Sequence, residues 1–190
     1  MPRLFTGLEV PSDVAQALAL KKGALRKSRW IEPSEYHITL RFVGDVEVPV
    51  AEALQAGLAA AKARPPFTVT LNGLAAFGGN KPHSIYASVA SNRELSDLKA
   101  EHEQIARQAG IGPEPKKFVP HVTLARLSRG SEPPAVAAYL GESGFFAPLS
   151  FQVERVVLFS ARESTGGGPY VVEAAYPLIA TEAPPAASDA

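Results

Sequence analysis

Two copies of the pattern His-x-Thr-Leu contain the residues of this 190-residue chain that are best suited to chemistry. His37 and Thr39 belong to the first copy, and His121 and Thr123 belong to the second. Imidazole transfers protons near neutral pH because its unperturbed pKa is about 6.5. Hydroxyl groups donate hydrogen bonds to phosphate oxygens. The two pairs therefore predict acid–base chemistry at a phosphorus centre, with one histidine protonated and the other neutral.

Both copies lie in stretches that alternate like β-strands, residues 36–44 and 121–127. Side chains at positions i and i+2 of a strand share a face, so His37 and Thr39 are expected to project together while Ile38 enters the core. A single such histidine is usually structural. Two copies in matching surroundings favour a functional interpretation.

The surroundings of the motif repeat as well as the motif. The first half is expected to contain a strand at 4–10, a helix at 12–26, a strand at 36–44, a helix at 50–62 and a strand at 67–77. The second half is expected to contain a strand at 84–90, a helix after the capping box Ser91-x-x-Glu94, a strand at 121–127, a helix near 134–141 and strands at 149–161 and 170–178. This order indicates a duplication into two similar lobes with a groove between them.

Two arginines are candidates for binding the phosphate. Arg41 lies four residues after His37, so strand parity predicts that both side chains share a face. Arg126 lies five residues after His121 and has the opposite parity, so a bulge or a strand end is needed to turn it inward.

Three further features could border the groove. Lys116 and Lys117 could make its mouth basic, or could simply increase solubility. The loops at residues 78–84 and 164–170 occupy equivalent positions in the two halves, and His83 belongs to the first of them.

The composition restricts the class of protein. Apolar residues make up 46% of the chain, and 19 basic residues balance 19 acidic ones, which argues against a broad surface that coats nucleic acid. The absence of cysteine excludes thiol nucleophiles and thiolate zinc sites. Neither a signal peptide nor a membrane span is expected, so the sequence predicts a soluble, cytoplasmic monomer without metal or cofactor. Residues 181–190 are expected to form a disordered tail beyond a single bilobal domain at 1–180.

The sequence resembles the 2H phosphoesterases, and in particular the RNA 2′,3′-cyclic phosphodiesterases, also called 2′-5′ RNA ligases. The resemblance covers about residues 2–179 and is carried by the phrases RLFTGLEVP, RWIEPSEYHITLRFVGDV, FVPHVTLAR and VVLFSARES. It implies an α+β fold with two lobes, whose antiparallel sheets flank a central cleft.

The resemblance also implies metal-free hydrolysis of a 2′,3′-cyclic phosphate to a 2′-phosphate. His37 would be the acid that protonates the leaving 3′ oxygen, and His121 the base that activates water. Thr39 and Thr123 would hold the phosphate, and Arg126 occupies a position where the family often has arginine. Ligation through a 2′-5′ bond, hydrolysis of another small cyclic phosphate, and non-catalytic binding of RNA ends stay open as alternatives.

Overall fold

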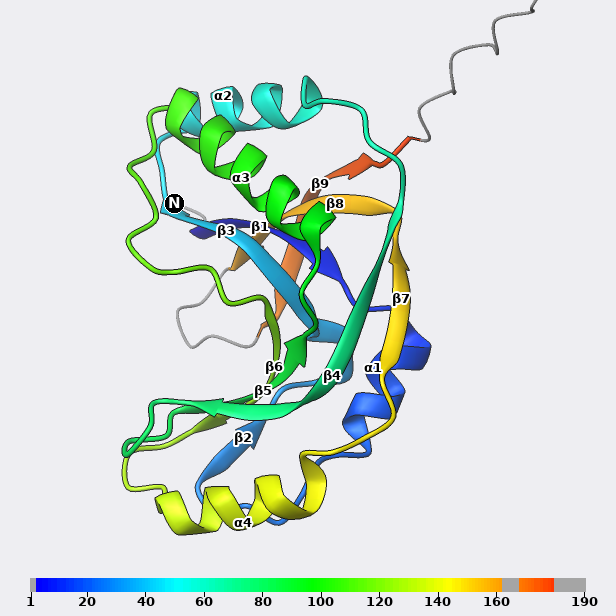
Figure 1. The fold of residues 1–190 in the computed structure, drawn as a ribbon. Helices are drawn as coiled ribbons and strands as arrows, with labels where there is room; N and C mark the ends of the chain where they lie inside the picture. The colour runs from blue at the N-terminus through cyan, green and yellow to red at the C-terminus, as the bar shows by residue number, and fades with distance from the viewer. Residues whose placement is uncertain (1–2, 162–167, 180–190) are drawn as a thin grey trace, which may run out of the picture.

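The computed structural model describes residues 3–161 and 168–179, which form an α+β fold with one antiparallel sheet and four α-helices (Figure 1). The helices are α1 (Ser12–Ala19), α2 (Val48–Ala59), α3 (Arg93–Gln108) and α4 (Pro133–Ser143). The strands are β1 (Arg3–Glu9), β2 (Ser28–Trp30), β3 (His37–Asp45), β4 (Phe67–Phe77), β5 (Ser84–Val89), β6 (His121–Leu127), β7 (Leu149–Val153), β8 (Arg155–Ala161) and β9 (Tyr170–Pro177). The expected disordered tail and most of the expected loop at 164–170 lie outside the described residues.

The sheet consists of two halves that meet at one point. Its strand order is β7-β4-β5-β6-β3-β1-β8-β9, with β2 also paired to β6. Strands β3 and β6 join the halves through a single residue pair, Ile38 with Val122. The two antiparallel sheets expected from the sequence are therefore continuous in the structure. The extent of the domain, residues 1–180, stays a prediction.

The two halves of the sheet do not coincide with the two halves of the chain. Strand β4, from the first half of the sequence, pairs with β5 and β7, whereas β8, from the second half, pairs with β1. Helices α2 and α3 pack together over the part that contains β1 and β3, and α4 packs against β4 at the opposite end (Figure 1). The first half of the chain thus contributes β4 to the part of the sheet that contains β6, and the second half contributes β8 to the part that contains β3, so the two lobes share strands.

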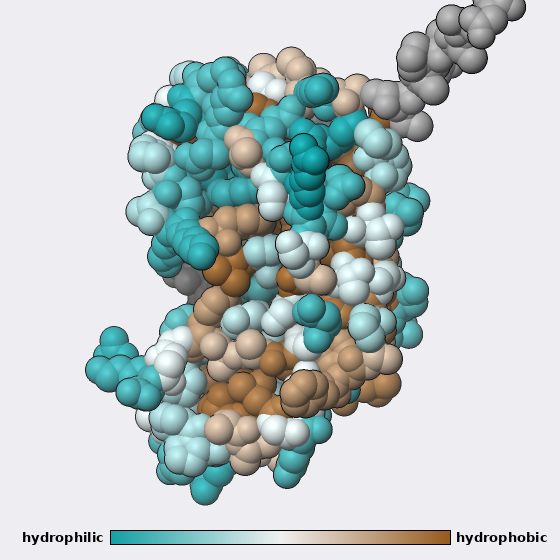
Figure 2. All heavy atoms as spheres, in the orientation of Figure 1, coloured by the Kyte–Doolittle hydropathy of each residue, from teal (hydrophilic) through white to brown (hydrophobic). Residues whose placement is uncertain are grey.

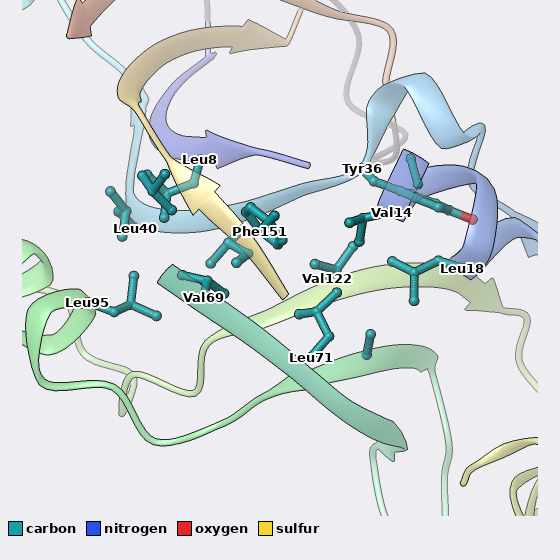
Figure 3. Close-up of a cluster of buried hydrophobic side chains, with 14 of the residues drawn as sticks. Leu8, Val14, Leu18, Tyr36, Leu40, Val69, Leu71, Leu95, Val122 and Phe151 are labelled. Carbon is teal, nitrogen blue, oxygen red and sulfur yellow. The ribbon is translucent and has the colours of Figure 1, made fainter. Parts of the chain in front are cut away.

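The largest hydrophobic cluster lies where the halves join. Ile38 and Val122, the middle residues of the two motifs, are both fully buried within it. Figure 3 shows Leu8, Val69 and Phe151 converging on the same cluster from three other strands. Full burial of such a side chain stabilises the fold by about 1.5–3 kcal/mol. The apolar residues of the motifs therefore hold the junction at which their polar neighbours lie.

The first expected helix is shorter than predicted. It ends at Ala19 instead of about residue 26. The next residues instead pack on Tyr139, whose hydroxyl donates a 2.7 Å hydrogen bond to the carbonyl of Lys21 and whose ring leaves no room for a side chain at Gly23. These tertiary contacts lead the chain into the short strand β2, which was not predicted.

Two other boundaries differ from the expectation. The N-cap of α3 is Asn92, not Ser91, because the Asn92 side chain accepts a 2.8 Å hydrogen bond from the Leu95 amide. The expected strand at 149–161 is interrupted at Glu154, where the chain passes from one half of the sheet to the other.

Substitution of Gly7 by alanine should destabilise the fold. A Cβ atom at Gly7 would lie 2.7 Å from the carbonyl oxygen of Ile38, at the junction of the halves. Overpacking of this kind costs about 1–3 kcal/mol. Denaturant unfolding should show this loss for Gly7→Ala. Gly141→Ala is the control, because a Cβ atom in that helical position meets nothing within 4 Å. Equal unfolding midpoints for the two variants would contradict the assignment of Gly7 to a close backbone contact.

Candidate active site

The structure brings the two predicted motifs to one face of the sheet. Each motif is centred on a residue of the joining pair, Ile38 or Val122. Because neighbouring residues in a strand point to opposite faces, the histidine and threonine on either side of each centre share the face away from the core. On extension of the antiparallel register, His37 lies opposite Thr123. This pairing supports the expected convergence of the two motifs, whose role as a site stays a prediction.

Backbone carbonyls orient both imidazole rings in the same way. His37 Nδ1 donates a 2.9 Å hydrogen bond to the carbonyl of Glu35, and His121 Nδ1 donates a 2.7 Å hydrogen bond to the carbonyl of Val119. Each carbonyl lies two residues before its histidine. His37 Nε2 also lies 3.1 Å from the Thr39 hydroxyl oxygen. With Nδ1 occupied in both rings, Nε2 is the atom through which each histidine can exchange a proton with a ligand.

Aromatic rings enclose His37 on the side of β1 and β9. The imidazole centroid lies 5.0 Å from the ring of Phe5 and 4.9 Å from that of Tyr170. Burial is the main reason why the His37 pKa falls to about 4, and the charges of His121 and Arg126 lower it further. His37 is therefore neutral in the unliganded protein at neutral pH.

His121 has a matching but less enclosed environment. Its ring lies 4.8 Å from Phe77 and 5.3 Å from Tyr86. Burial lowers the His121 pKa, and the nearby charge of Arg126 acts in the same direction. Both histidines thus favour the neutral state until an anion arrives. An anionic ligand would raise both pKa values.

A β-bulge in β6 turns Arg126 toward the site. Tyr86 pairs with Thr123 whereas Ile85 pairs with Ala125, so β6 contains one extra residue at this point. Beyond the bulge, Arg126 pairs with Ser84 and shares the face of His121. The bulge that the sequence required for Arg126 is present, and the binding of phosphate by Arg126 stays a prediction.

The equivalent bulge in β3 turns Arg41 away from the site. Gly7 pairs with Thr39 whereas Thr6 pairs with Arg41, so one extra residue again reverses the parity. Thr6 faces the helices, because its hydroxyl lies 2.7 Å from Nδ1 of His102 in α3. The prediction that Arg41 shares the face of its histidine is therefore wrong.

Arg41 instead fixes the segment that leads from α3 to β6. Its side chain is only 4% exposed and forms ion pairs with Glu103 at 2.6 Å and Glu114 at 3.3 Å. It also donates a hydrogen bond to the carbonyl of Gly112. These contacts assign Arg41 a structural role at the wall of the site.

Phe42, and not Arg41, lies on the face of β3 that carries His37 and Thr39. It pairs with Phe5, which contacts His37, and its side chain is 46% exposed. Phe42 is the counterpart in the first motif of Arg126 in the second, since each lies five residues after its histidine. Sequence reasoning missed it, although the bulge proposed for one repeat could have been applied to the other.

A pocket of about 900 Å³ adjoins these residues. Its lining includes Thr39, Phe42, His121, Arg126 and His83. The expectation that the loop at 78–84 lies by the groove is thereby confirmed. On the face of the molecule that Figure 2 presents, hydrophilic residues dominate the upper part and apolar residues gather toward the lower part.

The described residues were expected to hold neither a metal site nor a membrane-spanning helix. Within residues 3–161 and 168–179, no group of three histidine, aspartate or glutamate side chains is arranged to hold a metal ion. No helix in the same ranges has the length and apolar character needed to cross a membrane.

The sequence matches known proteins over most of its length. Residues 11–165 match the family model of the 2′-5′ RNA ligase superfamily. The RNA 2′,3′-cyclic phosphodiesterase of Bacillus subtilis is 29% identical over 168 residues, which cover 86% of each chain. The enzyme of the same name from Aeropyrum pernix is 35% identical over 130 residues, or 67% of this chain and 73% of the relative.

Solved structures share the fold. The crystal structure of E. coli LigT complexed with 3′-AMP aligns with a TM-score of 0.76 at 21% identity, over 94% of this chain and 99% of LigT. The protein TT0787 of Thermus thermophilus aligns with a TM-score of 0.71 at 25% identity, over 93% of this chain and 97% of that protein. The matched family model spans most of the chain and includes both histidine motifs, so this chain belongs to the 2′-5′ RNA ligase superfamily.

Proposed function

We propose that this protein hydrolyses the 2′,3′-cyclic phosphate at the end of an RNA strand to a 2′-phosphate. The observation that carries the proposal is the pair of histidines on one face of the sheet, each with its Nδ1 atom held by a backbone carbonyl. Two curated relatives named as RNA 2′,3′-cyclic phosphodiesterases, from B. subtilis and A. pernix, support the choice of substrate.

In the proposed reaction, His121 Nε2 takes a proton from a water molecule whose oxygen attacks the phosphorus. His37 Nε2 gives its proton to the 3′ oxygen as the bond from phosphorus to that oxygen breaks. The product carries a 2′-phosphate and a free 3′ hydroxyl, and the two histidines recover their protonation states by exchange with solvent. The choice of acid and base follows the family resemblance, since the two rings have similar hydrogen bonds.

The remaining groups act on the phosphate. Thr39 and Thr123 hold its non-bridging oxygens through their hydroxyls, and Arg126 stabilises the negative charge that grows in the transition state. The phosphate anion also raises the pKa of His37, which burial lowers to about 4, and so lets this histidine carry the proton that it must donate. A cytoplasmic location and a monomeric state form part of the same proposal.

Replacement of either histidine should abolish most of the activity. His37→Ala and His121→Ala should each reduce turnover of a nucleoside 2′,3′-cyclic phosphate by about 10²–10⁴-fold, the range for loss of a positioned proton-transfer group. Substrate affinity should change much less, because the threonines and Arg126 remain. Assays are run in EDTA to remove adventitious metal. Near-normal turnover in both variants would leave RNA-end binding as the better account.

The pH dependence should report the lowered histidine pKa values. Activity needs one neutral and one protonated histidine, so kcat/KM should rise and then fall with pH. Because burial lowers both pKa values in the free protein, the kcat/KM optimum should lie below about pH 6.5. The kcat optimum should lie at higher pH, since bound phosphate raises both pKa values. A kcat/KM that increases steadily up to pH 9 would be incompatible with two-histidine catalysis.

Arg126 and Arg41 should respond differently to substitution by alanine. Arg126→Ala should lower kcat/KM and raise the pKa values of His37 and His121, because its charge lowers both. Imidazole NMR titration measures the second effect, and Arg129→Ala, outside the pocket lining, is the control. Arg41→Ala should instead reduce the unfolding free energy by about 3–5 kcal/mol, as expected when one partner of a buried ion pair is removed. Unchanged histidine pKa values in Arg126→Ala would remove this arginine from the site.

A further inference from the structure

The segment between α3 and β6, residues 109–120, forms one wall of the pocket. Figure 1 shows it passing from the end of α3 beside β3 to the start of β6. Lys116 and Lys117 belong to this wall, and both are exposed. Lys117 lies four residues before His121, so the extended chain allows at most about 14 Å between their Cα atoms. The two lysines are therefore close to the catalytic end of the pocket.

Side-chain contacts hold the wall in place at several points along its length. Arg41 bonds the Gly112 carbonyl and pairs with Glu114. The Glu114 amide donates a 3.2 Å hydrogen bond to Glu103. Further along the segment, the Lys99 ammonium lies 5.6 Å from the centre of the Phe118 ring. Such a wall presents its lysines in a defined position, unlike a loose loop whose lysines serve only solubility.

The charges on the wall are not balanced within the pocket. Arg41 and Lys99 lie against Glu103 and Glu114, and these four groups form a neutral network. Among the described residues that line the pocket, Glu114 is the one carboxylate, so no acidic side chain there is left for Lys116, Lys117 or Arg126. The whole chain has equal numbers of acidic and basic residues. The positive charge is thus concentrated at the site and would attract a polyanion.

The pocket also has more room than one reacting phosphate needs. Its volume of about 900 Å³ lies near the upper end of the range of about 300–1,000 Å³ for small-molecule sites. The exposed side chains of Phe42 and Val119 add apolar surface to the same pocket. Apolar surface next to separated cations suits a strand in which bases alternate with phosphates.

We propose that Lys116 and Lys117 bind backbone phosphates on the 5′ side of the reacting nucleotide, and so give this protein a preference for RNA strands over cyclic mononucleotides. This inference rests on the proposed function. The lysines determine specificity and do not take part in the chemical step, because Arg126 and the threonines serve the reacting phosphate.

The test compares substrates that share the same terminal nucleoside 2′,3′-cyclic phosphate. These are the mononucleotide, the mononucleotide with a 5′-phosphate, and a tetranucleotide. Lys116→Ala/Lys117→Ala should raise KM for the tetranucleotide roughly 3- to 30-fold with little change in kcat, as expected for two exposed charge contacts. The mononucleotide should keep its wild-type kcat/KM within about two-fold. The log–log dependence of tetranucleotide KM on salt should become shallower by about 1.4, because each of the two lost phosphate contacts removes about 0.7.

Controls separate charge from position. Lys21→Ala/Lys22→Ala removes the same charge from a lysine pair outside the pocket lining and should leave both substrates unaffected. Lys116→Arg/Lys117→Arg should restore the preference for the strand. Equal losses on mononucleotide and tetranucleotide, or no loss on either, would overturn the proposal. The double alanine variant could also raise KM for the 5′-phosphorylated mononucleotide by as much as it raises KM for the tetranucleotide. That result would assign the lysines to the 5′-phosphate of a single nucleotide and would overturn the strand subsite.

A binding measurement keeps this test separate from the proposed function. Fluorescence anisotropy with a labelled tetranucleotide that ends in a 2′-phosphate requires no turnover. Weaker binding by the Lys116→Ala/Lys117→Ala variant than by wild type supports the strand subsite even if no cyclic phosphate is hydrolysed. Equal binding by both proteins contradicts the subsite even if hydrolysis is normal.

Discussion

The site depends on one constraint, the narrow junction at which β3 and β6 pair through Ile38 and Val122. These apolar residues are fully buried, and the alternation of a strand then places their polar neighbours on the opposite, accessible face. An antiparallel pair also has a local two-fold axis, so extension of the register places each histidine opposite the threonine of the other motif. Core packing and site geometry are therefore set by the same few residues, and a shift of register at the junction would disrupt both.

The exchange of strands between the repeats connects the two halves of the sheet beyond the single pair at this junction. Phe159 in β8 belongs to the second repeat but packs beside His37 of the first, whereas Phe77 in β4 belongs to the first and packs beside His121 of the second. Each of the two histidines is thus enclosed by aromatic side chains from both repeats. This enclosure is the main reason why the pKa values of both histidines are lowered.

Much of this arrangement could be predicted from the sequence, because local patterns carry it. Alternation predicted β4 and β6 at their observed bounds, and the repeated motif predicted that His37 and His121 converge. Arg41 was misplaced because a bulge changes strand parity, and bulges depend on pairing with a neighbouring strand that the local pattern does not reveal. The exchange of β4 and β8 was missed for a similar reason, since periodicity identifies a strand but not its partners. The charge network around Arg41 likewise depends on Glu103 and Glu114, which are far from it in the sequence.

The central claim is that two histidines act on one phosphate as a unit, and a double-mutant cycle tests it most directly. The measurement is kcat for hydrolysis of a nucleoside 2′,3′-cyclic phosphate by wild type, His37→Ala, His121→Ala and the double variant. Groups that act together in one transition state give strongly non-additive losses, so the double variant should be about as slow as the slower single variant. Losses that multiply in the double variant would show two independent contributions and would contradict the account.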